Sequence, residues 1–183
     1  LGLKLEGMSA AEKAVFAERA RWFLVDNERG QRVSIRVGER THRLKRAGPN
    51  GHFLNRVRID AKEIERLRAG IGDNRVSLRT VNAADAPHDQ RAEVHLLEVT
   101  GLSVVSDLDD TIKVSQVTDR EALLRNTFCR PFQAVPGIAA LYRAWATNHG
   151  AQFHYVSASP WQLYPALAGF VQTNGFPAGS WHL

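Results

Sequence analysis

Cysteine, long apolar runs and charge at the C-terminal end are scarce in this sequence, and each absence excludes a class of protein. The 183 residues contain one cysteine, Cys129, which excludes an internal disulfide and a cysteine-based zinc site. No apolar run approaches the roughly 20 residues that span a bilayer. The N-terminus also lacks the continuous apolar stretch of a secretory signal. We therefore expect a reducing, cytoplasmic location.

Charge is distributed unevenly along the chain, although the formal net charge is +5. No Asp, Glu, Lys or Arg occurs from residue 144 to residue 183, where an average composition would place about ten. That segment has the composition of a protein interior. Because the first residue is also leucine rather than methionine, we expect the sequence to be part of a longer chain.

The first 98 residues predict a small antiparallel β-rich domain, sandwich-like and with short helices. Capping-box spacing at Ser9 and Glu12 predicts a helix to about Arg19, and Asp60 with Glu63 predicts another. Six segments rich in Val, Leu and Ile are separated by turn signals and predict strands. They are residues 21–26, 31–37, 41–46, 52–59, 75–81 and 92–99.

Residues 99–183 predict an α/β domain. The apolar run at 102–106 ends in acidic residues, which is typical of a buried parallel strand that delivers a loop at its carboxyl end. Helix signals follow at 118–124 and 136–149, then a strand at 152–157 and a helix from Ser159 to about Thr173. Alternating strands and helices are the pattern of a doubly wound parallel sheet.

The acidic cluster Asp107-Leu108-Asp109-Asp110-Thr111 is the strongest chemical signal. Two carboxylates about 4 Å apart repel each other by roughly 1 kcal/mol in water and about 4 at a partly shielded site. A cation among them relieves that repulsion, and closely spaced carboxyl oxygens suit Mg²⁺. The alternative interpretation is a solvated acidic turn at the end of a strand.

A second signal lies fifty residues further on, at Ser157-Ala158-Ser159-Pro160. A strand that ends in serine before a helix start directs backbone N–H groups and a hydroxyl to one place, where an anion can bind. An ordinary helix N-cap explains the same residues. Because parallel strands joined by a crossover end at the same sheet edge, we expect Ser157 to lie beside the acidic loop.

Asp-x-Asp-x-Thr in this context resembles the first motif of the haloacid dehalogenase superfamily of phosphatases. The resemblance implies that Asp107 is a nucleophile that forms an aspartyl-phosphate and that Asp109 is the acid and base. It also implies that Asp107 and the Asp109 backbone carbonyl bind Mg²⁺, and that Thr111 and Ser157 bind the phosphoryl group. The implied fold class is α/β, a partial haloacid-dehalogenase-like (Rossmann-like) parallel sheet, preceded by the β-rich domain.

Several blocks between residues 101 and 183 extend the resemblance, and DLDDTIKVS and HYVSASPWQLYP are the most specific of them. They are similar to the catalytic domain of the phosphatidate phosphatase family of the yeast actin-patch type. That implies Mg²⁺-dependent hydrolysis of phosphatidate to diacylglycerol and phosphate. The lysine and late acidic pair of the superfamily are expected after Leu183, so we expect residues 1–183 alone to be inactive or nearly so. Lys113 lies just past the acidic loop, where it either takes the place of that lysine or is a surface or flap residue, and we expect the latter.

A basic run precedes the α/β region. Between positions 32 and 58 a single acid, Glu39, accompanies eight basic residues: Arg32, Arg36, Arg40, Arg43, Lys45, Arg46, Arg56 and Arg58. On paired strands alternate members share one face, which predicts either peripheral contact with an anionic membrane or an ordinary solvated sheet face. Only one aromatic residue, Phe53, lies within this stretch, so no set of stacking aromatic side chains interleaves with the basic residues and nucleic acid is not an expected partner.

Two further functional interpretations stay open. One keeps the phosphatase chemistry and changes the substrate to a soluble or polynucleotide phosphate. The other is a non-catalytic module that binds anionic membranes and retains a vestigial acidic loop. The aromatic residues Trp161, Tyr164 and Trp181 lie near the predicted site, where they either meet an acyl chain or pack in the core.

Overall fold

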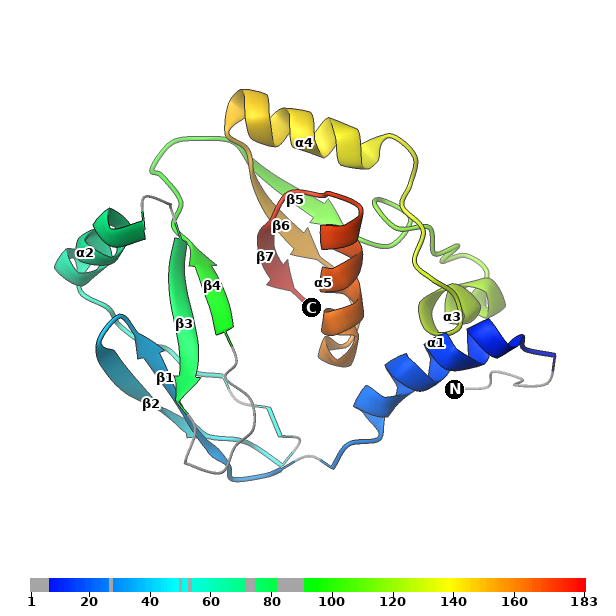
Figure 1. The fold of residues 1–183 in the computed structure, drawn as a ribbon, viewed down its shortest axis with the longest axis horizontal. Helices are drawn as coiled ribbons and strands as arrows, with labels where there is room; N and C mark the ends of the chain where they lie inside the picture. The colour runs from blue at the N-terminus through cyan, green and yellow to red at the C-terminus, as the bar shows by residue number, and fades with distance from the viewer. Residues whose placement is uncertain (1–6, 27, 50, 53, 72–74, 82–90) are drawn as a thin grey trace. The chain divides into compact units, whose positions relative to one another are not determined.

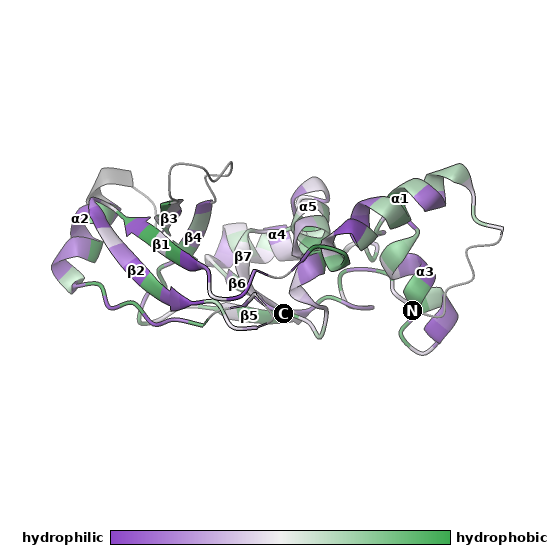
Figure 2. Cartoon of the chain, turned by 90° about the horizontal axis from the view of Figure 1, so that it is seen from below, coloured by the Kyte–Doolittle hydropathy of each residue, from purple (hydrophilic) through white to green (hydrophobic). Residues whose placement is uncertain are grey.

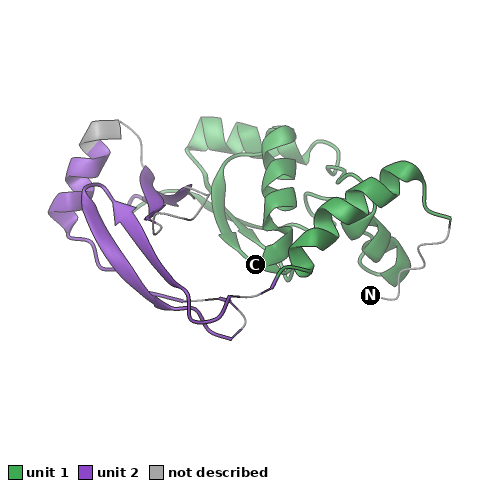
Figure 3. Cartoon of the chain, turned by 60° about the horizontal axis from the view of Figure 1, so that its bottom comes forward, with its two compact units in different colours: residues 1–25, 99–183 green, residues 26–98 purple. Residues whose placement is uncertain are grey.

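A computed structural model of the chain describes residues 7–26, 28–49, 51–52, 54–71, 75–81 and 91–183. The chain divides into two compact units (Figure 3): unit 1 is Leu1–Val25 with Val99–Leu183, and unit 2 is Asp26–Glu98. Among the described residues, no helix combines the length and the apolar character needed to cross a membrane.

The N-terminal helix α1 (Ala10–Ala20) begins with the predicted capping box. Glu12 N donates to Ser9 Oγ at 3.2 Å, and Ser9 N donates to Glu12 Oε2 at 3.0 Å. Strand geometry predicted for residues 21–26 is wrong, because α1 continues into the 3₁₀ helix η1 (Arg21–Phe23). Its Phe23 ring makes an edge contact with Phe128, far along the chain.

Residues 1–25, which we expected within the β-rich domain, cluster with residues 99–183 instead. Arg19 explains this grouping, because its guanidinium NH1 donates to the backbone oxygens of Thr127 at 2.6 Å and Arg130 at 2.9 Å. The same guanidinium lies 3.7 Å from the centre of the Phe132 ring. These contacts bring together residues more than 100 positions apart, which no local pattern reveals.

The described residues of unit 2 form one four-stranded antiparallel sheet of order β2-β1-β3-β4 and no second sheet, which a sandwich would need. Residues 54–59 are not in a strand, so the strand predicted over 52–59 is wrong there. Gly38, with φ +57°, makes the turn between the first two strands, and a side chain there would meet Leu67. The elements are β1 (Arg32–Val37), β2 (Arg40–Arg46), α2 (Ala61–Ile71), β3 (Arg75–Val81) and β4 (Arg91–His95).

Unit 1 contains a three-stranded parallel sheet of order β5-β6-β7, with helices in the connections (Figure 1). The structure therefore confirms the predicted fold class, a mixed α/β chain with a partial Rossmann-like sheet and a separate antiparallel sheet. Its elements after residue 98 are β5 (Ser103–Asp107), α3 (Arg120–Phe128), α4 (Ile138–His149), β6 (Gln152–Val156), η2 (Trp161–Leu163), α5 (Tyr164–Thr173) and β7 (Gly179–His182).

Local signals account for several of these boundaries. Helix α3 begins one residue later than its capping-box spacing predicts, because Asp119 is the N-cap and accepts from Glu121 N and Ala122 N. Helix α4 ends at Gly150, whose φ of +60° is the left-handed conformation that glycine adopts readily. The strand β7 carries no strong local signal and forms by pairing with β6.

The core of unit 1 covers one face of the parallel sheet. Phe153 and Tyr155 of β6 are buried there with Leu167 and Phe170 of α5. The opposite face is open in the described structure, since Val105 of β5 is 71% exposed. The expectation that β5 is a strand buried on both faces is therefore wrong for that face.

Candidate active site

The acidic loop and the Ser157 segment meet at the carboxyl edge of the parallel sheet. Asp107 ends β5 and pairs in register with Val156, the last residue of β6, which places Ser157 next along that edge. Ser157 Oγ donates to Asp109 Oδ2 at 3.3 Å, which joins residues 48 positions apart. The expected proximity of the two motifs is thus present in the structure.

Asp107 is the more accessible of the two predicted catalytic aspartates. It is exposed at the end of β5, and Thr111 Oγ1 donates to its Oδ2 at a long 3.5 Å. Behind it, the buried Ser106 Oγ donates to the Asp107 backbone oxygen at 2.8 Å and hydrogen-bonds Tyr142 Oη at 3.0 Å. The strand end is held by these buried bonds while the Asp107 carboxylate stays open to a ligand.

Asp109 has a dense set of partners. Lys113 Nζ lies 2.7 Å from its Oδ1, and Ser115 Oγ donates to the same oxygen at 2.6 Å. Burial by itself raises the pKa of the Asp109 carboxyl, but the hydrogen bonds from Lys113 and Ser115, the Lys113 charge and the Ser157 bond outweigh it. The net result is a lowered pKa, so the carboxyl is ionised in the resting site.

Lys113 is a buried residue, which corrects the expectation of a surface or flap position. It is 1% exposed, and its ammonium contacts Asp109 and Ser115 and lies 4.9 Å from the centre of the Phe132 ring. A charged amine is rarely buried unless it is paired, because removing it from water is costly. The sequence alone did not indicate that Lys113 is buried, because its burial depends on how Asp109, Ser115 and Phe132 are placed around it by the fold.

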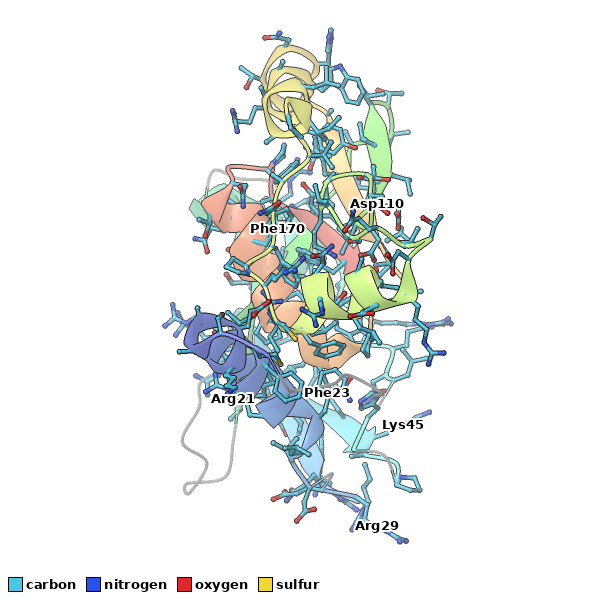
Figure 4. The ribbon with its side chains drawn as sticks, turned by 90° about the vertical axis from the view of Figure 1, so that its right-hand side faces the viewer. Arg21, Phe23, Arg29, Lys45, Asp110 and Phe170 are labelled. Carbon is cyan, nitrogen blue, oxygen red and sulfur yellow. The ribbon has the colours of Figure 1, made fainter. Side chains whose placement is uncertain are left out.

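Asp110 shapes the loop and takes no part in the candidate catalytic cluster. Its backbone has φ +57°, and its carboxylate accepts from the amides of Ser115 at 2.7 Å, Gln116 at 2.8 Å and Val117 at 2.8 Å. These backbone bonds, with Val117 contributing most, lower the pKa of the Asp110 carboxyl. Figure 4 marks Asp110 in the segment that follows β5.

Ser157 forms a local turn and contacts the acidic loop, but it is not the N-cap of the helix that follows. Ser157 Oγ accepts from Ser159 N at 3.0 Å, a local turn of the kind that precedes a helix, and also donates to Asp109. The helix starts as the 3₁₀ turn η2 before α5, and neither has a side-chain cap. The hydroxyl of Ser157 is therefore aimed at the acidic loop by its own turn.

Two oxygen atoms of the acidic loop are available to a divalent cation. Within the loop, Lys113 N donates a hydrogen bond to Leu108 O and Asp110 N donates to Lys113 O. Neither of these hydrogen bonds uses the Asp109 backbone oxygen. That oxygen and the exposed Asp107 carboxylate are hard ligands that fit Mg²⁺. Across the described ranges, no three His, Cys, Asp or Glu side chains gather as a metal site. The Asp107 carboxylate and the Asp109 backbone oxygen are therefore suitable ligands for Mg²⁺, but they would supply only part of its coordination shell.

Fold and site together define an α/β domain whose parallel sheet presents an acidic Asp-x-Asp-x-Thr loop at its carboxyl edge, where such sheets bind ligands. Residues 102–183 match the family model described as the catalytic domain of phosphatidate phosphatase APP1. This part of the chain is similar to that family.

Two relatives are similar to part of the sequence. The uncharacterized protein C29B5.04c of Schizosaccharomyces pombe is 36% identical over 89 residues, which cover 47% of this chain. Phosphatidate phosphatase APP1 of Saccharomyces cerevisiae is 37% identical over 82 residues, which cover 43% of this chain. In each case the aligned segment is 14% of the length of the relative.

Proposed function

We propose that this chain carries the acidic part of the active site of a Mg²⁺-dependent phosphatase of the haloacid dehalogenase superfamily. Its proposed substrate is a lipid phosphate monoester, phosphatidate, and its products are diacylglycerol and phosphate. The family match and the name of the yeast relative support the substrate. The observation that carries the proposal is the 3.3 Å contact between Ser157 and Asp109 beside Asp107, which assembles the site from two separate motifs.

In the proposed reaction, a carboxylate oxygen of Asp107 forms a bond to phosphorus while the bond from phosphorus to the lipid oxygen breaks. Asp109 gives that oxygen a proton, so the first product leaves as an alcohol. Water then attacks the aspartyl-phosphate, Asp109 takes its proton, and phosphate leaves with Asp107 restored. Thr111 and Ser157 hydroxyls hydrogen-bond the phosphoryl oxygens.

The low pKa of Asp109 has a direct consequence for these two steps. The ionised form is the base that the second step needs. The first step needs the protonated form, and the negative charge of a bound phosphate raises the pKa of a neighbouring carboxyl. Lys113 and Ser115 hold Oδ1, so Oδ2, which faces Ser157, is the oxygen that we expect to exchange the proton.

Mg²⁺, held by the Asp107 carboxylate and the Asp109 backbone oxygen, would neutralise phosphate charge and orient the phosphoryl group. The described residues offer only part of its shell. We therefore propose that residues 1–183 by themselves turn over substrate poorly or not at all.

Exposed aromatic rings near the site favour a lipid over a soluble substrate. Trp161 is 47% exposed and Tyr164 is 39% exposed, and both lie within seven residues after Ser157 in the sequence. Their rings lie 5.9 Å apart, and Tyr164 makes an edge contact with Trp181. Rings with an apolar body and a polar tip suit the boundary between a headgroup and an acyl chain.

The test is phosphate release from phosphatidate vesicles with Mg²⁺, measured on the protein in its full natural length and on residues 1–183. Asp107→Asn should reduce the rate at least about 10³-fold, since the nucleophile is lost. Glu121→Gln, which removes one charge from a side chain that is 77% exposed, is the control and should leave the rate unchanged.

Three results would contradict the proposal in different ways. Turnover that survives Asp107→Asn would remove the nucleophile assignment. Hydrolysis of soluble or polynucleotide phosphates without hydrolysis of phosphatidate would replace the substrate. Vesicle binding without turnover by the full-length protein would favour the non-catalytic membrane module.

A further inference from the structure

One face of the unit 2 sheet presents arginines from all four strands. Side chains alternate across a strand, and residues paired in register share a face. Arg36 of β1 pairs with Arg79 of β3, which pairs with Arg91 of β4. Arg32 pairs with Arg46 of β2, and Ser34 of β1 pairs with Arg43. The register shifts between these two pairs, so a bulge in β2 lets both of its arginines share this face. We call these exposed residues the basic face: Arg32, Arg36, Arg43, Arg46, Arg79 and Arg91.

The opposite face of the same sheet is apolar, which explains why the arginines point outward. Val37, Leu44 and Val76 are buried on it. Polar and apolar segments accordingly alternate along β1 in Figure 2. Burial of the apolar side determines which residues must face outward, but it does not require those residues to be arginines.

Like charges lie directly opposite one another on the basic face. Arg32 faces Arg46, and Arg79 faces both Arg36 and Arg91. Such cross-strand pairs destabilise a sheet. The pKa of Arg32 is lowered, chiefly by the charge of Arg46 and then by that of Arg43. The opposed arginines lower the stability of the sheet. A bound anion would offset that repulsion, so the pairing is consistent with a surface that binds anions.

Acidic side chains do not neutralise the β1–β2 part of this face. Within the described residues, Arg32, Arg36, Arg43 and Arg46 form no ion pair with Asp or Glu. The arginine of β2 that does form one, Arg40, pairs with Asp60 at 3.3 Å and belongs to the other face.

We propose that the basic face is a docking surface for a bilayer containing anionic lipids. Neighbouring strands are about 4.8 Å apart, and Arg32 and Arg36 are separated by about 13 Å along β1. A sheet face with arginines at these spacings can contact several lipid phosphates of one bilayer surface at the same time. Each guanidinium group can donate two parallel hydrogen bonds to one phosphate.

A nucleic-acid partner fits this surface less well. Proteins that hold single strands combine a basic groove with aromatic rings on which bases stack. Residues 26–98 contain one aromatic residue, Phe53, among the 15 of the whole chain. The membrane proposal rests on this sheet and is independent of the catalytic function proposed for unit 1.

The experiment is cosedimentation of residues 1–183 with vesicles of phosphatidylcholine alone or with 30% phosphatidylserine. Phosphatidylserine is the probe because it is anionic and is no substrate for a phosphomonoesterase. Binding is expected with the anionic vesicles only and should weaken as salt is raised. The variant R32Q/R36Q/R43Q should lose about 100-fold in partition coefficient, since each basic residue contributes roughly fivefold.

A second triple variant, R56Q/R58Q/K62Q, removes the same charge from unit 2 outside the sheet. It should bind within about threefold of the original chain. The melting temperature of R32Q/R36Q/R43Q should stay the same or rise, because opposed like charges are removed. Asp107→Asn should bind as tightly as the original chain, which separates docking from catalysis.

The proposal is overturned by equal binding to both vesicle types or by equal losses in the two triple variants. Tighter binding to an oligonucleotide than to anionic vesicles at the same salt would also overturn it and assign the face to nucleic acid.

Discussion

Two aspartates of one motif are expected to differ sharply in their effect on stability when each is changed to asparagine. Asp109→Asn removes the counter-charge of Lys113, which is 1% exposed and has no access to water. Asp107→Asn changes an exposed side chain whose described contact is a 3.5 Å bond from Thr111. Both substitutions should impair catalysis, but only the first should destabilise unit 1.

The magnitude follows from the burial of the ammonium. Removing one partner of a buried ion pair costs about 3–5 kcal/mol, because an uncompensated charge stays in the interior. Ser115 and the Phe132 ring still contact Lys113, so the lower end of that range, about 3 kcal/mol, is expected. Asp107→Asn should remain within about 0.5 kcal/mol, as for most surface substitutions.

Urea unfolding followed by tryptophan fluorescence measures this difference in the correct unit. All four tryptophans belong to unit 1: Trp22, Trp145, Trp161 and Trp181. The double variant Asp109→Asn with Lys113→Met removes both charges and should recover at least about 1 kcal/mol relative to Asp109→Asn alone. For a unit of this size, 3 kcal/mol corresponds to a fall in melting temperature on the order of 10 °C.

Equal destabilisation by Asp109→Asn and Asp107→Asn would refute this reasoning. A double variant less stable than Asp109→Asn would also refute it, since it would show that the buried ammonium carries no penalty without its partner.

Other predictions follow from the glycines and from Asp110. Gly179→Ala should destabilise unit 1 by about 2–3 kcal/mol, because a Cβ there would lie 2.4 Å from the Phe153 backbone oxygen. Gly169→Ala in α5 meets no atom within 4 Å and should stabilise by about 0.5–1 kcal/mol; destabilisation by both would contradict the packing argument. Asp110→Asn should speed hydrogen exchange at the three amides bound by that carboxylate, while φ +57° remains acceptable to asparagine. Since the folded pKa of Asp110 is lowered, its stabilising effect is present above the unfolded pKa of about 3.9 and is lost as pH falls through the lower folded value. The free energies of unfolding of the original chain and of Asp110→Asn should therefore become equal in strongly acidic solution. A difference that stays constant with pH would show that the charge of Asp110 does not cause the stabilisation.

Some of this molecule could be predicted from the sequence because the cause is local or periodic. The Ser9–Glu12 capping box starts α1 with its own side chains, and Gly150 ends α4 through its own backbone. The meeting of the acidic loop with Ser157 was also predictable, since two parallel strands joined by a helix must end at one edge. Those rules need no knowledge of distant contacts.

Other features depended on partners that a local pattern does not specify. Residues 52–59 have the composition of a strand, but a strand needs a neighbouring strand to bond with, and residues 54–59 pair with no strand in the part of the chain that the structure describes. Arg19 attaches α1 to unit 1 through carbonyl groups more than 100 positions away. The sequence around Lys113 predicts an ordinary loop lysine, whereas in the folded chain its ammonium contacts Asp109, Ser115 and the Phe132 ring. The sequence by itself determined the alternation of strands and helices after residue 99 and the acidic motif, because periodicity and helix signals are encoded locally. Only the tertiary structure decided which charges are buried, because burial depends on everything that packs around them.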